Sequence, residues 1–248
     1  NELPEYSYVE LSDTEDLYVY SFGGGIYVAD GNVDGADVTY SFNAADAGGG
    51  SYIDLGGIYT ANWHNWDGNW AAAGGGVGSV GDWSATNAVM VNNVSVDGDG
   101  VQGGSALDVA DGGASATNVS MVGNEGLAAV YLTGASTTTL LNSIVSDNRD
   151  GSLYDGETTA ALTVQYSTAY NGPGDLFGSF TDPTGVDGNL DSDPAFVAWS
   201  ADGDSSNDDF ALAAGSPAID AGSPASAYND VDGSVNDQGA FGGPNGAW

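Results

Sequence analysis

The feature that most constrains the fold of this chain is an internal repeat with a period of about two dozen residues. Glycine clusters at residues 23–25, 48–50, 74–76 and 103–104 are each followed by a short apolar stretch typical of a β-strand. An asparagine keeps the same period, with spacings of 26, 24, 31, 24 and 23 residues: Asn43, Asn69, Asn93, Asn124, Asn148 and Asn171. The long step contains the best internal match, because the Ser-Ala-Thr-Asn of residues 84–87 recurs at residues 115–118. Units this short bury little apolar surface alone, so the repeat predicts stacking.

Two further columns of residues follow the same period. An apolar column lies three residues before the recurrent asparagine: Tyr40, Trp66, Met90, Met121, Val145 and Thr168. An amide column lies six residues before it: Asn87, Asn118, Asn142 and Gln165. Stacked coils would pile the apolar side chains inside and let amides bond along the stack. We therefore predict an all-β fold, a parallel β-helix of about six or more coils of roughly 23–31 residues, stacked about 4.8 Å apart.

The expected organisation has three parts. Residues 1–22 form an N-terminal strand segment that could cap the first coil or reach into a neighbouring molecule. Residues 23–180 form the β-helix repeats. Residues 181–248 are rich in Asp, Gly and Pro and are expected to form a C-terminal cap over the open last coil, because an exposed sheet edge needs cover.

Charge limits the possible partners. The chain has 35 acidic residues against one Arg and no Lys, for a net charge of −34. Nucleic-acid affinity depends on Lys and Arg contacts to phosphate, so a nucleic-acid role is excluded, and anionic membranes and polyuronates are repelled. Divalent cations, cationic partners and neutral glycans remain. The chain has no Cys and therefore no disulfide or thiolate site. It contains no run of about 20 apolar residues, so no transmembrane segment is predicted.

The C-terminal region carries a recognisable signature: Asp193–Val197, Phe210–Leu212, Gly215–Gly222, Asp230–Gly233 and Asp237–Gly243. It resembles the terminal signature of bacterial right-handed parallel β-helix proteins of the choice-of-anchor Q type. The repeats are similar to the Gly-Gly-apolar and aromatic-x-x-Asn units of polymorphic outer-membrane β-helices, with the aromatic kept at Tyr40 and Trp66. The resemblance implies a right-handed helix that is secreted or anchored at the bacterial cell surface. It implies little about chemistry, because this fold hosts lyases, hydrolases, adhesins and scaffolds. Asn1 is interpreted as the start of a mature form left by signal-peptide removal.

The Asp-rich loops of the C-terminal region are candidate Ca²⁺ sites. Hard oxygen donors alternate around Gly turns, and the predicted ligands are Asp230, Asp232, Asp237, Asp202 and Asp204. Ca²⁺ takes six to eight such oxygens, although none of these loops matches a complete EF-hand. The alternative is that the same carboxylates only stabilise turns through Asx hydrogen bonds.

Few side chains are suited to catalysis. Arg149 is interpreted as one half of an ion pair with Asp147 or Asp150 on a turn, and His64, the sole His, as a structural residue of a surface coil. No Ser lies in a nucleophile-elbow pattern, and no carboxylate pair stands out among 35 acidic residues. Trp66 belongs to the apolar column, whereas Trp63 and Trp70 are predicted to face outward and contact a glycan or a partner.

These observations predict a non-catalytic, extracellular or cell-surface structural or adhesive β-helix, calcium-stabilised and capable of self-assembly. The alternatives are a carbohydrate-active enzyme that uses acidic residues and a glycan-binding module without catalysis. An ice-binding surface would need Thr ranks across many coils, and Thr137–Thr139 marks only one.

Overall fold

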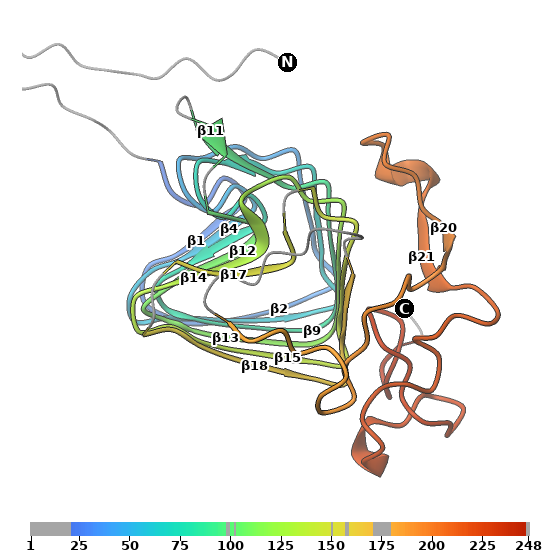
Figure 1. Cartoon of the computed structure of the whole chain (residues 1–248). Helices are drawn as coiled ribbons and strands as arrows, with labels where there is room; N and C mark the ends of the chain where they lie inside the picture. The colour runs from blue at the N-terminus through green and yellow to red at the C-terminus, as the bar shows by residue number, and fades with distance from the viewer. Residues whose placement is uncertain are drawn as a thin grey trace, which may run out of the picture.

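The chain folds into a parallel β-helix of about six turns with almost no helical structure, as the repeat predicts. The computed structural model describes residues 21–97, 100–101, 103–149, 151–156, 159–170 and 180–246. The predicted N-terminal strand segment and Asn171 therefore lie outside the described residues, apart from residues 21 and 22. Successive coils stack in Figure 1, which looks along the column, and three sheets form its sides.

The first sheet contains one strand from each coil. In order along the stack these are β1 (Ile26–Val28), β4 (Ser51–Ile53), β8 (Val77–Ser79), β12 (Gly104–Ala110), β14 (Ala128–Thr133) and β17 (Leu153–Asp155). All five pairings are parallel. The first four strands begin at or just after the glycine clusters at residues 23–25, 48–50, 74–76 and 103–104. The clusters therefore mark the corner that leads into this sheet.

The second and third sheets are continuous in two coils. The second contains β2 (Gly31–Ala36), β5 (Gly57–Asn62), β15 (Thr137–Leu141) and β18 (Ala161–Gln165), and the third contains β3 (Thr39–Ser41), β6 (Asn65–Asp67), β16 (Ile144–Ser146) and β19 (Thr168–Tyr170). The ten-residue strands β9 (Asp82–Val91) and β13 (Gly113–Val122) run through both sheets and pair side by side. The two Ser-Ala-Thr-Asn segments are in register there, with Ser84 opposite Ser115. A further short sheet follows the third, built from β7 (Trp70–Ala71), β10 (Val94–Asp97) and β11 (Gly100–Val101).

The interior of the helix holds the predicted apolar column. Tyr40, Trp66, Met90, Met121 and Val145 are stacked in register, and all but the half-buried Tyr40 are fully buried or nearly so. The prediction is wrong in the last coil, where Ala169 rather than Thr168 pairs with Val145. The described strands of this coil pair with residues 24 positions earlier, whereas the step from Asn148 to Asn171 is 23 residues.

The ladder of amides along the stack is formed by the recurrent asparagines and not by the amide column for which it was predicted. Each side chain donates an Nδ2–H to the Oδ1 of the next: Asn43 to Asn69 at 2.9 Å, Asn69 to Asn93 at 2.9 Å, Asn93 to Asn124 at 3.0 Å and Asn124 to Asn148 at 2.9 Å. The same Oδ1 atoms also accept the backbone N–H of the preceding asparagine. Buried amides at a corner thereby satisfy both themselves and the turn backbone, which ties neighbouring coils together.

The amide column behaves differently from the prediction. Asn87, Asn118 and Asn142 adopt positive φ values of 51°, 53° and 51°, which Asn tolerates better than most residues, and they bend the chain between the second and third sheets. Their side chains do not bond along the stack. Asn87 Nδ2 instead donates to the carbonyl oxygens of Ala240 and Gly242, at 2.8 and 2.7 Å. Gln165 is not part of this column, because Tyr166 takes the positive-φ position of the last coil.

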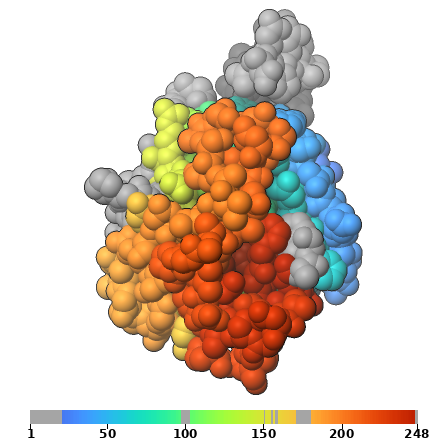
Figure 2. Space-filling view, turned by 90° about the vertical axis from the view of Figure 1, so that its right-hand side faces the viewer, coloured from blue at the N-terminus to red at the C-terminus, as the bar shows by residue number. Residues whose placement is uncertain are grey.

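The C-terminal region differs from the expected cap. Residues 187–190 stack on the last coil, where Leu190 pairs with Thr168 and Asn189 Oδ1 accepts the Ser167 N–H at 3.0 Å. Phe180 also packs against the helix interior at this end. Residues 194–246 turn away from the open end and run back along the outer side of the third sheet, as the orange and red segment shows in Figures 1 and 2. It includes the hairpin β20 (Phe196–Ala198) and β21 (Asp209–Leu212) and the short 3₁₀ turns η1 (Ser205–Asn207) and η2 (Ser226–Tyr228). We call residues 194–246 the side arm.

Apolar packing explains why the side arm lies there. The third sheet turns Val89, Val91 and Val122 outward, and Phe210 and Ala240 of the side arm bury them, with Phe196 and Trp199 packed alongside. Exposed valines on this face would be unfavourable in water, and the arm removes them from solvent. Among the described residues, no helix has the length and apolar character needed to cross a membrane.

Candidate binding surfaces

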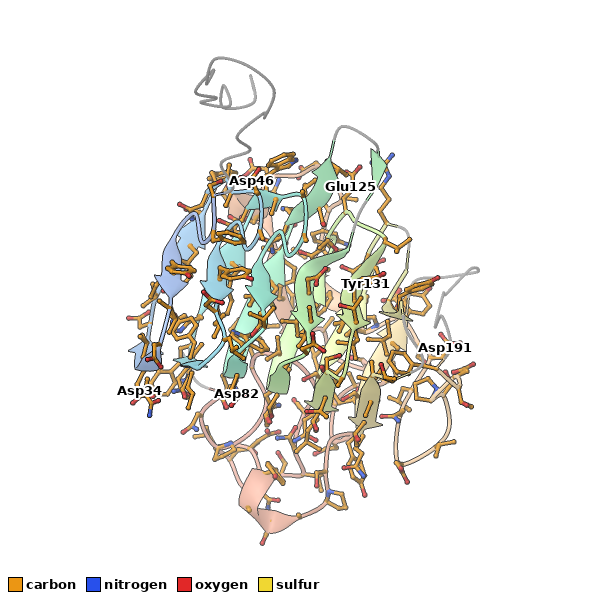
Figure 3. All side chains as sticks on the ribbon, turned by 90° about the vertical axis from the view of Figure 1, so that its left-hand side faces the viewer. Asp34, Asp46, Asp82, Glu125, Tyr131 and Asp191 are labelled. Carbon is orange, nitrogen blue, oxygen red and sulfur yellow. The ribbon has the colours of Figure 1, made fainter. Side chains whose placement is uncertain are left out.

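The outer face of the first sheet carries a row of side chains that no sequence column had indicated. The parallel register aligns the outward positions of the six strands: Tyr27, Tyr52, Gly78, Asp108, Tyr131 and Tyr154. We call this set the tyrosine row. Tyr27 and Tyr52 stack at 5.9 Å with an interplanar angle of 13°, and Tyr131 and Tyr154 stack at 5.6 Å and 9°. The row faces the viewer in Figure 3, where Tyr131 is labelled, on the side opposite the arm.

The centre of the tyrosine row has a gap and a carboxylate. Gly78 leaves one coil without a side chain, and the ring of Tyr52 lies over it. Asp108 Oδ2 accepts the Gly104 N–H at 2.9 Å. Burial raises the pKa of Asp108 to about 6, while the same hydrogen bond opposes the rise. The pKa of Tyr52 is also raised, by its burial and by the carboxylates of Asp54 and Asp108.

At the N-terminal end of the row, Phe22 packs against Tyr52 at 4.8 Å, and the Tyr27 hydroxyl donates to Asp54 Oδ2. Phe22 and Tyr27 are 44% and 45% exposed. This end of the row therefore presents aromatic surface to solvent, while Tyr52, Tyr131 and Tyr154 are half-buried.

His64 is fully buried inside the helix and not in a surface coil, which corrects the sequence interpretation of its place. Its Nδ1 lies 2.8 Å from the Asn62 carbonyl oxygen and donates to it, so Nε2 accepts from the Tyr59 hydroxyl at 2.9 Å. The Tyr40 hydroxyl completes the chain at 2.8 Å from that of Tyr59. Burial lowers the pKa of His64, which favours the neutral ring. The structural role predicted for His64 fits these contacts.

Arg149 lies on the surface and pairs with Glu125, one coil earlier in the stack, whereas its predicted partner Asp150 lies outside the described residues. Its side chain is 65% exposed, so solvent screens the pair and its contribution to stability is small. Glu125 is labelled at the upper edge of Figure 3.

The two tryptophans predicted to contact a partner are separated in the structure. Trp63 is half-buried at the corner of the second and third sheets, and its Nε1–H donates to the Asn245 carbonyl oxygen of the side arm at 3.0 Å. Trp63 therefore contacts the chain's own C-terminal region. Trp70 forms part of β7, after the asparagine ladder, and is also half-buried.

The five acidic residues predicted as Ca²⁺ ligands mostly bind their own backbone. Asp232 Oδ1 accepts the Ser234 N–H at 2.9 Å, and Asp202 and Asp204 make equivalent turns with N–H groups two residues on. Asp230 Oδ2 accepts the Asp237 N–H at 3.0 Å. Within the described ranges, no group of three or more His, Cys, Asp or Glu has the arrangement of a metal site. These contacts are the Asx turns of the alternative interpretation, and calcium binding stays a prediction.

Charge repulsion accompanies the 230–237 turn. Burial raises the pKa values of Asp230 and Asp237, hydrogen bonds from backbone N–H groups oppose the rise, and the carboxylates of Asp220 and Asp232 add to it. In this part of the side arm, hydrogen bonds from backbone N–H groups therefore offset the repulsion between neighbouring carboxylates.

Comparison with protein-family models, with curated proteins and with solved structures finds no match to this chain. The fold and its surfaces define the class of protein, an acidic parallel β-helix with an open tyrosine row and a third sheet covered by its own side arm. The resemblance to the choice-of-anchor Q type remains a prediction beyond that class.

Proposed function

We propose that this chain is a non-catalytic structural or adhesive protein of the extracellular space or bacterial cell surface, and that it self-associates through the tyrosine row. The observation that carries the proposal is the order of residues in the row. Along the stack it reads Tyr, Tyr, Gly, Asp, Tyr, Tyr. When the row is laid against a reversed copy of itself, each Tyr faces a Tyr and each Asp faces the space left by a Gly.

A two-fold axis perpendicular to the column makes the row self-complementary. It places Tyr27 opposite Tyr154 of a second copy, Tyr52 opposite Tyr131, and the Gly78 gap opposite Asp108. An isologous interface of this kind uses one patch twice and closes after two copies. The row spans five coil spacings, or about 24 Å, which suits a modest contact rather than an obligate interface.

Protonation is expected to control this contact. Each copy would bring one Asp108 carboxyl to the centre of the interface, and an ionised carboxylate there loses solvent. Because the pKa of Asp108 is raised to about 6, the carboxyl becomes neutral in mildly acidic solution. Association should therefore strengthen as the pH falls through about 6. The Asp108→Asn variant should associate equally above and below that pH.

The non-catalytic part of the proposal draws on two side chains. Both ring nitrogens of His64 are hydrogen-bonded inside the core, and Arg149 pairs with Glu125. A carbohydrate-active enzyme that uses acidic residues is the second candidate from the sequence.

Sedimentation velocity tests the proposal. The parent protein should form dimers at pH 5 and fewer at pH 7.5, and Tyr131→Asp should remain monomeric at both values because it adds a charge to the row. Val231→Asp is the matched control, since Val231 is 66% exposed and belongs to the side arm rather than to the row. A parent protein that stays monomeric at high concentration, or equal behaviour of the two variants, would reject self-association through this face.

A further inference from the structure

A groove crosses the corner between the first and second sheets, at a place that neither the sequence nor the proposed function uses. It has a volume of about 410 Å³ and is open to solvent along its length. Four aligned positions of the second sheet set its course: Ile58, Asp82, Gly113 and Thr137. Four coils make three spacings, so the groove is about 14 Å long. In Figure 3, Asp82 is labelled at the lower end of the first sheet, beside this corner.

The floor of the groove is peptide backbone. A Cβ at Gly81 would lie 2.3 Å from the Asp54 carbonyl oxygen, and one at Gly112 would lie 2.1 Å from the Gly81 carbonyl oxygen. Successive corners therefore stack too closely for any side chain, and glycine is required there. The floor presents peptide groups at the spacing of the coils.

The walls combine three kinds of chemistry. Leu55 and Ile58 form an aliphatic end and are 79% and 39% exposed. Asp82 and Asp111 place carboxylates in the middle, and Thr137 adds a hydroxyl at the far end. Asp111 Oδ1 accepts the Ala135 N–H at 2.8 Å, which fixes that carboxylate against the wall.

We infer that this groove binds a short stretch of a neutral, hydroxyl-bearing polymer, that is, a neutral oligosaccharide. Carboxylates accept hydrogen bonds from sugar hydroxyl groups, and the C–H faces of a sugar ring pack on exposed aliphatic side chains. The volume lies within the range of small-molecule sites, and the open ends suit a chain that continues past them.

Charge decides between ligand classes. The two carboxylates and the net charge of −34 exclude polyanions. A basic peptide would be attracted by the acidic surface everywhere, so it would gain little that is specific to the groove. A neutral chain gains nothing from the distant charges and depends on the groove itself.

Gly113 allows the groove to be filled without disturbing the stack. Its outward Cβ would meet only the Asp82 Oδ1 atom closely, at 2.7 Å, and that atom is the end of a movable side chain. Gly113→Leu should therefore fold and block the groove at its centre. Ser115→Leu is the matched control, because Ser115 lies two residues further along β13 on the same face and is also half-buried, but does not line the groove.

Calorimetric titration with neutral tetra- to hexasaccharides of glucose, mannose and xylose tests the inference, with an oligolysine peptide as the competing probe. At least one oligosaccharide should bind the parent protein, and Gly113→Leu should weaken it by about tenfold or more, equivalent to about 1.4 kcal/mol. Ser115→Leu should leave the affinity unchanged, and added salt should change it little because the ligand is neutral.

Three outcomes would overturn the inference: no oligosaccharide binds, binding survives Gly113→Leu, or only oligolysine binds in a salt-sensitive way that Gly113→Leu weakens. Each is independent of self-association through the tyrosine row. Sedimentation of Gly113→Leu should match the parent protein, so failure of one proposal leaves the other standing.

Discussion

Replacing Asn93 with alanine removes the middle of the asparagine ladder. The fully buried Asn93 side chain accepts the Asn69 backbone N–H at 3.1 Å and the Asn69 Nδ2–H at 2.9 Å. It also donates to the Trp66 carbonyl oxygen at 2.8 Å and to Asn124 Oδ1. Asn124 Oδ1 keeps the Asn93 backbone N–H in the variant. Three buried groups on Asn69 and Trp66 lose the partner that Asn93 supplied.

The magnitude follows from the number of groups left without that partner. A buried polar group that loses its hydrogen bond costs about 1–3 kcal/mol, so Asn93→Ala should lower the free energy of unfolding by at least about 3 kcal/mol. That is a large share of the total stability of a typical domain, about 5–15 kcal/mol. For a chain of this size, the midpoint of thermal unfolding should fall by roughly 6 °C or more.

Asn43→Ala is the matched control at the end of the ladder. Asn43 donates its backbone N–H and its Nδ2–H to Asn69 Oδ1, and the backbone bond survives the substitution. The Asn43 position is half-buried, so the expected loss is about 1 kcal/mol. Urea unfolding followed by circular dichroism would measure both variants. If the two lose equal stability, the ladder does not act as a buried network and the reasoning is wrong.

Four further predictions address other parts of the molecule. Asn118→Ala should make the side arm cleavable by a protease before the helix unfolds, because Asn118 Nδ2 donates to Asp237 and Gly239. Asp108 has a raised pKa of about 6 in the folded state, so stability should rise as the pH falls from 6 toward 4, and Asp108→Asn should remove that part of the pH profile. Arg149→Ala should change the free energy of unfolding by less than about 1 kcal/mol. If Ca²⁺ binds, millimolar Ca²⁺ should raise the melting temperature more than monovalent salt, Asp232→Asn should reduce that rise, and elemental analysis should find bound metal.

The interior of the fold could be predicted because its repeats act through identical side chains in identical places. The recurrent asparagines and the apolar column hold their period from residue 40 to residue 148, and the structure stacks both. The last coil could not be placed because one added residue shifts the register without changing composition. Asn171 continues the asparagine spacing in the sequence but lies outside the described residues, and Val145 aligns with Ala169, one residue later than the apolar column predicts.

The surfaces could not be predicted in the same way, because the residues that align on them from coil to coil are of different types. The tyrosine row contains a Gly and an Asp among four Tyr, and only the pairing register shows that they align. The aligned residue is the second of β1, β4, β8 and β17 but the fifth of β12 and the fourth of β14, so its place within the strand does not reveal it. The groove is harder still to predict. Its floor is backbone that is exposed because Gly81 and Gly112 have no side chain, and no residue type in the sequence marks it.

The position of the side arm follows from the corner amides and decides which faces remain for function. A residue at that corner must adopt positive φ, which favours Asn, and an Asn there turns its amide outward past the end of the strand pairing. Asn87 and Asn118 therefore offer hydrogen-bond donors beside the apolar outer face of the third sheet, and the side arm satisfies both at once. The requirement for a sharp bend thus creates the docking site, and the arm buries the apolar outer face of the third sheet. In the described part of the chain, the arm leaves the first sheet and its corner groove uncovered, so we expect contacts with other molecules to concentrate there.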